Sequence, residues 1–499
     1  MSELGKKGVA AVKWGAISSA GRFVLQLGAG VVLARLLGPD AYGVFGMGLL
    51  VFTLSNFLAE FGFGWGLVQR VDLHPDDVRF AFTWQLVTGS VAALALLMLA
   101  PALGSFFHDE RVIPVIRWLA LACVLNAASA PAMNLLRRDM NFRTIGVIQL
   151  GSYFVGYVLI GIPLALSGAG TTTLVAAWLS QSVVNLLAAY WKRPHSLKLL
   201  FHYSGASSMF NMGATVFFTN LVNWFISNLD RVMVGRLLNA HAVGLYTTGS
   251  NLSNMPASLL LGSMQPAFLA AGARMQDDLP RLRDSYLQIL GTIWALIAPA
   301  MTVLAMLAPA LVRFVYGEAW ADAGHVLAIL FLAVPLQLTW CMTTPVLWNT
   351  GRKHLEVLAQ LPVLGVSIAL FYLFAGGSVE AAALVGAGST GLRALVIFFV
   401  TLPGAQISWW PVLARILRGL LLSAALAGAT WGGLQLAARW SGHPLLSLSL
   451  GGGCALALAG MLVLLRPSVL GPDAARMVAR FIPRLAGVLR VQPTAASGR

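Results

Sequence analysis

Residues 31–45 of the chain read VVLARLLGPDAYGVF, and residues 232–246 read VMVGRLLNAHAVGLY. Each copy ends one apolar segment, makes a short turn and begins the next, so the match joins equivalent places in the chain. An internal repeat at a fixed offset, here 201 residues, is typical of a duplicated bundle. Six of the fifteen aligned positions are identical: Val31/Val232, Arg35/Arg236, Leu36/Leu237, Leu37/Leu238, Ala41/Ala242 and Gly43/Gly244.

The segments on either side of the repeat are long and apolar. The chain has 499 residues, of which 58% are hydrophobic and 10% charged, and its mean hydropathy is +0.78. A soluble globular chain has about 25% charged residues, so this composition excludes a set of soluble domains. A hydrocarbon core of about 30 Å needs roughly 20 apolar residues per helix. Fourteen transmembrane spans are therefore predicted, at 12–37, 42–66, 80–104, 113–136, 144–167, 171–191, 206–234, 241–270, 286–315, 324–350, 354–375, 378–402, 411–436 and 445–465.

The offset between the two copies contains six spans, an even number, so both copies cross the membrane in the same direction. Such halves are parallel repeats, related by an axis along the membrane normal, and transporters built this way bind substrate between halves that rock. We therefore expect an all-α integral membrane protein with two parallel six-helix repeats and two extra C-terminal helices. The expected divisions are a first bundle at 1–204, a second at 205–402, two additional helices at 403–466 and a basic cytoplasmic tail at 467–499.

The basic residues indicate how the chain is oriented. There are 33 Lys and Arg against 18 Asp and Glu, which gives a net charge of +15. If both termini and every second connection are cytoplasmic, 24 of the 33 basic residues lie on that side, six on the other and three within spans. This distribution follows the positive-inside rule, so we expect cytoplasmic termini and no nucleic-acid partner. Arg476, Arg480 and Arg484 recur every four residues opposite apolar side chains, which predicts an interfacial helix on anionic lipid.

Several features argue against an enzyme. The longest connections, around 192–205 and 271–285, are on the predicted cytoplasmic side, whereas a membrane glycosyltransferase, polymerase or ligase usually has a sizeable outer loop. Cysteines 123, 341 and 454 fall in separate spans and the eight histidines have no metal-ligand spacing, so no metal or cofactor is expected. The sequence also lacks the phosphate-binding pattern GxxxxGK[ST]. An ion or substrate gradient must therefore drive any transport, rather than ATP.

Charged side chains inside the spans are the first candidate functional residues, because a charge near the bilayer centre costs a few kcal/mol. Arg22 lies nine residues past Lys13, which places it about 13 Å deep. Gln26 is one turn further on the same face, and Arg393 lies at a similar depth in its own span. Each arginine either faces a watery cavity and binds ligand or forms a structural ion pair.

Two acids are also predicted to lie within spans. Glu60 lies about as deep in the second span, where it would pair with Arg22 or act as a protonatable group coupled to ion movement. Asp230 and Arg231 stand side by side near the outer end of the span 206–234. Adjacent residues on a helix point about 100° apart, so these two do not simply pair with each other.

The span 206–234 is also the most polar in the chain. Asn220, Asn223 and Asn228 lie along it, and their amides would bind sugar hydroxyls or hold neighbouring helices together. Indole rings away from the membrane interfaces are candidates for stacking on sugars. These are Trp65, Trp224 and Trp340.

A family resemblance is carried by KWGAISSAGRFVLQLGAGVVLARLLGPDAYGVFGM at 13–47, followed by LAEFGFGWGLVQR at 58–70. Later pieces are LLRRDMNFR at 135–143, NLDRVMVGRLL and VGLY within 228–246, and YGEAW at 316–320. Together they resemble the Wzx-type polysaccharide transporters, the oligosaccharide flippases of the MOP superfamily. Within that family the chain is most similar to the exopolysaccharide, colanic-acid-exporter-like branch. The resemblance covers the first twelve spans and extends to all fourteen.

The resemblance implies a flippase that moves undecaprenyl-diphosphate-linked oligosaccharide from the inner to the outer leaflet of the bacterial inner membrane, by alternating access. It implies a cationic central cavity for the diphosphate, and a role in exopolysaccharide or lipopolysaccharide biosynthesis. Arg22 fits the family's cavity arginine in the first helix, Glu60 its acidic position before FG, and Asp230 the acidic position of the seventh helix. Arg393 matches no family motif. A coupling ion (proton or sodium), membrane lipids and polysaccharide polymerase machinery are the further expected partners.

Elementary electrostatics agrees with this expectation, because a lipid diphosphate needs positive charge inside a low-dielectric cavity. One alternative is a multidrug or organic-cation antiporter of the related branch, which would need an acidic cavity. The charges within the predicted spans disfavour this alternative, because the two acids Glu60 and Asp230 are outnumbered by three arginines. The arginines are Arg22, Arg231 and Arg393. A second alternative is a flippase for peptidoglycan lipid II, whose function is close to that of an oligosaccharide flippase. The sequence alone separates these two functions poorly. An embedded sugar polymerase or ligase is the enzymatic alternative, disfavoured by the missing outer loop.

Overall fold

The computed structural model describes residues 3–60, 67–68, 73–202, 206–352 and 354–481. This part of the chain is helical and contains no strand. Segments η1 and η2 are π-helical, and η3 and η4 are 3-10 turns. In chain order the elements are α1 (Glu3–Glu60), α3 (Pro75–Phe107), α4 (Val112–Arg138), α5 (Phe142–Tyr153), η1 (Phe154–Gly161), α6 (Ile162–Leu166), α7 (Thr171–Lys192), α8 (Ala206–Leu237), α9 (Ala240–Ala273), α10 (Leu279–Thr292), η2 (Ile293–Ile297), α11 (Ala298–Tyr316), η3 (Glu318–Trp320), α12 (Ala321–Asn349), α13 (His354–Phe374), α14 (Val379–Ala405), α15 (Trp409–Trp440), α16 (Pro444–Leu465), η4 (Pro467–Leu470) and α17 (Gly471–Phe481).

The predicted spans coincide with these helices. Eleven helical segments in the described residues are long and apolar enough to cross a membrane. One of them, Gly21–Phe57 in α1, overlaps the first two predicted spans, and residues 61–66 of the second span lie outside the described residues. Helices α8 and α9 correspond to the seventh and eighth spans and are not among the eleven. The predicted class, an all-α multi-pass membrane protein, is confirmed.

The first two spans form one continuous helical element with a break. At Gly38 the backbone leaves the helix, with φ 73° and ψ 174°, a conformation that glycine adopts without steric cost. Pro39 follows, and proline is well suited to begin a helix because its fixed φ is helical and it lacks the N–H that would be left unpaired there. The turn predicted between residues 37 and 42 is therefore this local break inside α1.

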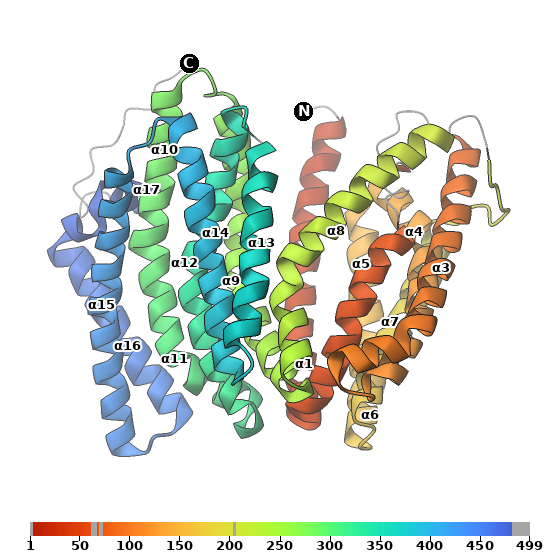
Figure 1. Ribbon diagram of the computed structural model, residues 1–499, viewed down its shortest axis with the longest axis horizontal. Coiled ribbons are helices and arrows are strands. Elements are labelled where there is room, and N and C mark those ends of the chain that lie inside the picture. The colour runs from red at the N-terminus through yellow and green to blue at the C-terminus, as the bar shows by residue number, and fades with distance from the viewer. Residues whose placement is uncertain (1–2, 61–66, 69–72, 203–205, 353, 482–499) are drawn as a thin grey trace. The chain divides into compact units, whose positions relative to one another are not determined.

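The chain forms two compact units, the first ending at Gly244 and the second beginning at Leu245. In the first unit, α4 packs against α1, α3 and α7, and side chains such as Leu119 and Ala127 are fully buried there. Helix α8, which opens the second predicted bundle, packs against α1 and α3 in this unit. Most long helices within each unit run roughly along one another (Figure 1). The bundle division at 204/205 stays a prediction from the repeat.

The second unit is built around α12, which packs against α11 and α14. Of the eleven candidate spans it has the largest buried share, 61% of its most apolar window. Its buried hydroxyls have partners: Thr343 Oγ1 lies 2.9 Å from Tyr286 Oη, and Trp294 Nε1 donates to Thr339 Oγ1 at 3.2 Å. Buried polar groups paired in this way avoid the cost of losing water. Helices α15 and α16 pack against each other and against α11.

Candidate functional site

Arg22 lies in the first half of α1 and is half-buried. Its Nη1 donates a hydrogen bond to Oε1 of Gln149 on α5 at 2.9 Å. The Gln149 amide is neutral, so it orients the guanidinium without neutralising its charge. Gln26, one turn along α1, is exposed. Glu60 ends α1 but its side chain lies outside the described residues, so its predicted pairing with Arg22 stays a prediction.

Other polar groups of the first unit were not singled out from the sequence. Asn126 on α4 donates to Asn56 on α1 at 3.3 Å between amide nitrogen and oxygen. Gln85 on α3 is 1% exposed, and neither polar atom of its amide has a hydrogen-bond partner in the described part of the chain. Isolated amides in apolar helices carry no spacing signal by which a sequence could identify them.

Trp224 on α8 has a structural role in this conformation. The side chain is 7% exposed, its Nε1 donates to Thr53 Oγ1 on α1 at 3.0 Å, and Phe225 packs edge-on against it at 5.3 Å. Its ring is therefore buried in this conformation, and sugar stacking on Trp224 stays a prediction. Asn223 is exposed, and Asn228 donates to the backbone carbonyl of Trp224 at 3.0 Å, within its own helix.

Asp230 and Arg231 are both half-buried on α8. The Asp230 carboxylate accepts a hydrogen bond from the backbone N–H of Arg231 at 2.9 Å. This bond fixes the carboxylate against its own helix at the place where the sequence predicted an intramembrane acid.

In the second unit, Arg393 on α14 stacks on Trp340 of α12, with its Cζ 5.2 Å from a ring centroid. Both side chains are half-buried. A guanidinium over an indole face is a cation–π contact, which holds the arginine in place and leaves its charge intact. This contact could not be predicted, because α12 and α14 are separated by a whole helix in the sequence.

A row of polar groups lies in the same unit. Gln337, one turn before Trp340 on α12, donates to Asn254 Oδ1 on α9 at 3.4 Å, and Asn254 donates to Ser250 Oγ at 3.3 Å. Ser389, one turn before Arg393, has a buried hydroxyl with no hydrogen-bond partner in the described residues. Amides, a hydroxyl, an indole and a guanidinium are the groups that bind sugars and phosphates.

The two copies of the repeat meet inside the first unit. A methyl group added to Gly43 would overlap the carbonyl of Ala240, and one added to Gly244 would overlap the carbonyl of Pro39. Gly43 aligns with Gly244 and Pro39 aligns with Ala240, so the contact is reciprocal. Only glycine lets two backbones approach this closely.

Charged residues hold the same end of the first unit. Arg111 donates to Asp40, just after the break in α1, at 2.6 Å and to Asp109 at 2.7 Å. Burial alone would raise the pKa of Asp109, but its hydrogen bonds to Arg111 and the charge of that arginine lower it overall. On α8, Arg236 Nη1 donates to the carbonyl of Phe106 at 2.7 Å. These arginines connect helices, which explains basic residues on the predicted outer side.

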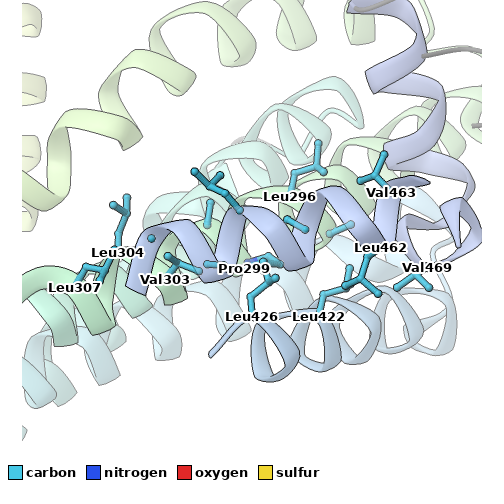
Figure 2. A pocket seen from close by; sticks show the side chains of 16 residues that line it. Leu296, Pro299, Val303, Leu304, Leu307, Leu422, Leu426, Leu462, Val463 and Val469 are labelled. Atoms are coloured by element: carbon cyan, nitrogen blue, oxygen red, sulfur yellow. The ribbon is translucent and has the colours of Figure 1, made fainter. Parts of the chain in front are cut away.

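An apolar pocket of about 510 Å³ lies among η2, α11, α15 and α16. Figure 2 shows Leu304 and Leu307 at one end of it and Leu462 and Val469 at the other. All of the described residues that line it have apolar side chains or are glycine.

The chain is similar to proteins of glycan biosynthesis. It is 25% identical over 333 residues to the lipopolysaccharide biosynthesis protein WzxC of Escherichia coli K12, a match covering 66% of this chain and 67% of the relative. It is 26% identical over 427 residues to the succinoglycan biosynthesis transport protein ExoT of Rhizobium meliloti, covering 82% and 85%. It is 22% identical to a probable low-salt glycan biosynthesis flippase, Agl15 of Haloferax volcanii, covering 78% and 84%.

Two solved structures share the fold. One is the lipid II flippase MurJ in an inward closed conformation, with a TM-score of 0.68 and 14% identity, covering 90% of this chain and 98% of MurJ. The other is an inward-facing multidrug MATE transporter of the MOP superfamily, with a TM-score of 0.59 and 16% identity, covering 79% and 95%. These two likenesses show that the chain shares their fold. Because residues 32–325 match the family described as polysaccharide biosynthesis protein, the chain belongs to that family.

Proposed function

We propose that the protein is a flippase for oligosaccharides linked to undecaprenyl diphosphate. It would move repeat units from the inner to the outer leaflet of the bacterial inner membrane for exopolysaccharide or lipopolysaccharide biosynthesis. Its family membership supports this proposal, as do the names of its relatives, which include a transport protein and a probable flippase. It is proposed to be a transporter and not an enzyme.

The observation that carries the proposal is a set of half-buried arginines inside apolar helices: Arg22 on α1, Arg231 on α8 and Arg393 on α14. Arg22 donates a hydrogen bond to the Gln149 amide and Arg393 stacks on the Trp340 indole, and both of these partners are neutral groups. Placing a charge in a span is costly, so such residues are usually functional. A diphosphate carries the opposite charge and strong acceptor oxygens that match guanidinium donors.

In the proposed mechanism the arginines bind the diphosphate and the polar row at Asn254, Gln337 and Trp340 contacts the sugars. The low dielectric around the site strengthens the attraction between arginine and phosphate. The two predicted bundles then alternate between states open to either leaflet. The reciprocal contact at Gly43 and Gly244 joins the two copies of the repeat at the end proposed to be the outer one.

The proposal also covers the orientation of the chain in the membrane, its energy source and its partner proteins. Both termini would be cytoplasmic, as the distribution of basic residues indicates. A proton or sodium gradient, acting through Glu60 or Asp230, would supply energy if the substrate gradient does not. Polysaccharide polymerase machinery would take up the delivered units.

The test is to delete the gene and identify the lipid-linked intermediate that accumulates on the cytoplasmic leaflet. The proposal predicts a complete oligosaccharide on undecaprenyl diphosphate, and complementation that fails with Arg22→Ala or Arg393→Ala although the protein inserts. Arg439→Ala, an exposed arginine at the end of α15, is the matched control and should complement. Accumulation of lipid II would instead indicate a lipid II flippase. Full export by both Arg22→Ala and Arg393→Ala would refute the cationic site.

A further inference from the structure

The apolar pocket of the second unit is open on its lipid-facing side. Leu456 of α16 lines it and is 76% exposed, while its neighbour Ala455 lines it and is 3% exposed. The pocket therefore runs from a buried floor to the surface that the bilayer covers. Small residues on α16 make room for it: Gly452, Ala455 and Ala459 share one face.

One end of this pocket carries positive charge. On α15, Leu422 lines the pocket and Arg418 lies one turn before it on the same face. After α16, Arg466 stands between Val463 and Val469, which both line the pocket. Both arginines are exposed, and neither has an ion pair in the part of the chain that the structure describes.

Helix α17 holds this charged end in place. Asp473 has only 7% of its side chain exposed, accepts from Arg415 Nε at 2.8 Å and pairs with Arg476 at 3.3 Å. The guanidinium of Arg418 lies directly against Gly471, so that a methyl group there would overlap it. Residues 409–476 contain one acid, Asp473, and it is already engaged by Arg415 and Arg476. The charges of Arg418 and Arg466 are therefore available to a ligand.

We propose that this pocket is a binding site for an anionic glycerophospholipid. One acyl chain lies in the apolar pocket among α11, α15 and α16, and the phosphate accepts hydrogen bonds from Arg418 and Arg466. The charge at one end and the continuous apolar lining match the two halves of such a lipid. The site is separate from the arginines proposed to bind the transported diphosphate.

The test uses the purified full-length protein, freed of lipid in a mild detergent. Binding of phosphatidylglycerol is measured by native mass spectrometry and by the rise in melting temperature, against phosphatidylcholine with the same acyl chains. Inorganic phosphate alone shows whether the headgroup suffices, and a polyprenyl monophosphate shows whether the pocket prefers a substrate-like chain.

We expect phosphatidylglycerol to bind more tightly than phosphatidylcholine, and inorganic phosphate to have no effect. The double variant Arg418→Ala/Arg466→Ala should weaken phosphatidylglycerol binding roughly 10- to 30-fold, from the attraction per basic residue near a lipid surface. Arg439→Ala, at the opposite end of α15, should change it by less than about twofold because it lies far from this end. Ala459→Phe, which fills the pocket, should weaken binding of both phospholipids.

Three results would overturn the inference. Equal binding of the two phospholipids would show that the site does not recognise the anionic headgroup. Unchanged affinity of the double arginine variant for phosphatidylglycerol would show that Arg418 and Arg466 do not bind it. Displacement of phosphatidylglycerol by an equimolar polyprenyl monophosphate would assign the pocket to the transported lipid instead. The double variant keeps the test independent of folding, because both arginines are exposed.

Discussion

Gly43 and Gly244 hold the same position in the two copies of the repeat, and each faces a backbone carbonyl of the other copy. The contact is reciprocal, since Gly43 meets Ala240 and Gly244 meets the aligned Pro39. A side chain at either position would force the two backbones apart. The repeat in the sequence is therefore also a contact in space.

Replacing Gly43 with alanine should disturb this contact, because the new methyl group overlaps a carbonyl that belongs to rigid backbone. Overpacking of this kind costs typically 1–3 kcal/mol. We expect a lower melting temperature and reduced polysaccharide export, measured in cells and on purified protein. Gly28→Ala in the same helix is the control, because nothing lies within 4 Å of the added methyl group. Equal behaviour of the two variants would contradict the close contact.

The charge of Arg22 should be more important than the shape of its partner. Gln149→Glu would place a carboxylate beside the guanidinium and neutralise it, so we expect export to be largely lost. Gln149→Leu removes a hydrogen bond to a charged group, worth about 1.5–3 kcal/mol, and should weaken export less. The measurement is the rate of polysaccharide export by Gln149→Glu and Gln149→Leu at matched protein levels. Stronger loss in Gln149→Leu would indicate that positioning of the guanidinium is more important than its charge.

The stack of Arg393 on Trp340 can be separated from the polar row beside it. Trp340→Leu removes an aromatic face that contributes about 0.5–2 kcal/mol to holding a cation, so export should fall several-fold. Trp340→Phe keeps an aromatic face and should retain more activity. If leucine and phenylalanine behave alike, the ring does not hold the arginine.

The segment after α7 should respond to acid. His195 packs 5.2 Å from Phe82 and 5.4 Å from Tyr190, between ring centroids, and burial lowers its pKa below the ordinary value of 6.5. Because the folded pKa is lower than the unfolded one, the stabilisation is complete above pH 6.5 and is lost as the pH falls through the folded pKa. Amide hydrogen exchange of residues 194–202 should accelerate on acidification.

The matched control for this pH dependence is His195→Phe, which keeps the packing without a titrating group. Its exchange should not depend on pH beyond the intrinsic chemical rate. The segment is also held by the backbone N–H of Leu200, which donates to Thr83 Oγ1 at 2.8 Å, so local opening rather than global unfolding is expected. Identical pH profiles of amide hydrogen exchange for the variant and the wild type would show that His195 does not cause the pH dependence.

The fold was largely predictable from the sequence because apolar length and basic residues report directly on membrane spans. The break in α1 was placed correctly between residues 37 and 42, since Gly38 and Pro39 are local signals. The contacts were not predictable. Trp224 donates a hydrogen bond to Thr53, and Arg22 donates one to Gln149. Both partners lie more than a hundred residues away in the sequence, so these contacts depend on tertiary packing.

Several polar groups that are buried or hydrogen-bonded in the structure could not be identified from the sequence. Gln85 and Asn254 are single amides in apolar helices, where no motif or charge distinguishes them. Asp473 lies in the segment 467–499, predicted as a basic cytoplasmic tail, and its side chain is buried against Arg415. Burial and pairing are properties of the folded chain, so the sequence marked charged positions and the structure showed which neighbours surround them.

The most direct measurement is translocation in proteoliposomes that contain the purified protein and an undecaprenyl-diphosphate oligosaccharide labelled on its sugar. Access of the label to an external glycosidase reports movement between leaflets. We predict protein-dependent movement that is retained in Arg439→Ala and lost in Arg22→Ala/Arg393→Ala. No movement above protein-free liposomes under an imposed proton or sodium gradient, or equal movement in all three proteins, would contradict it.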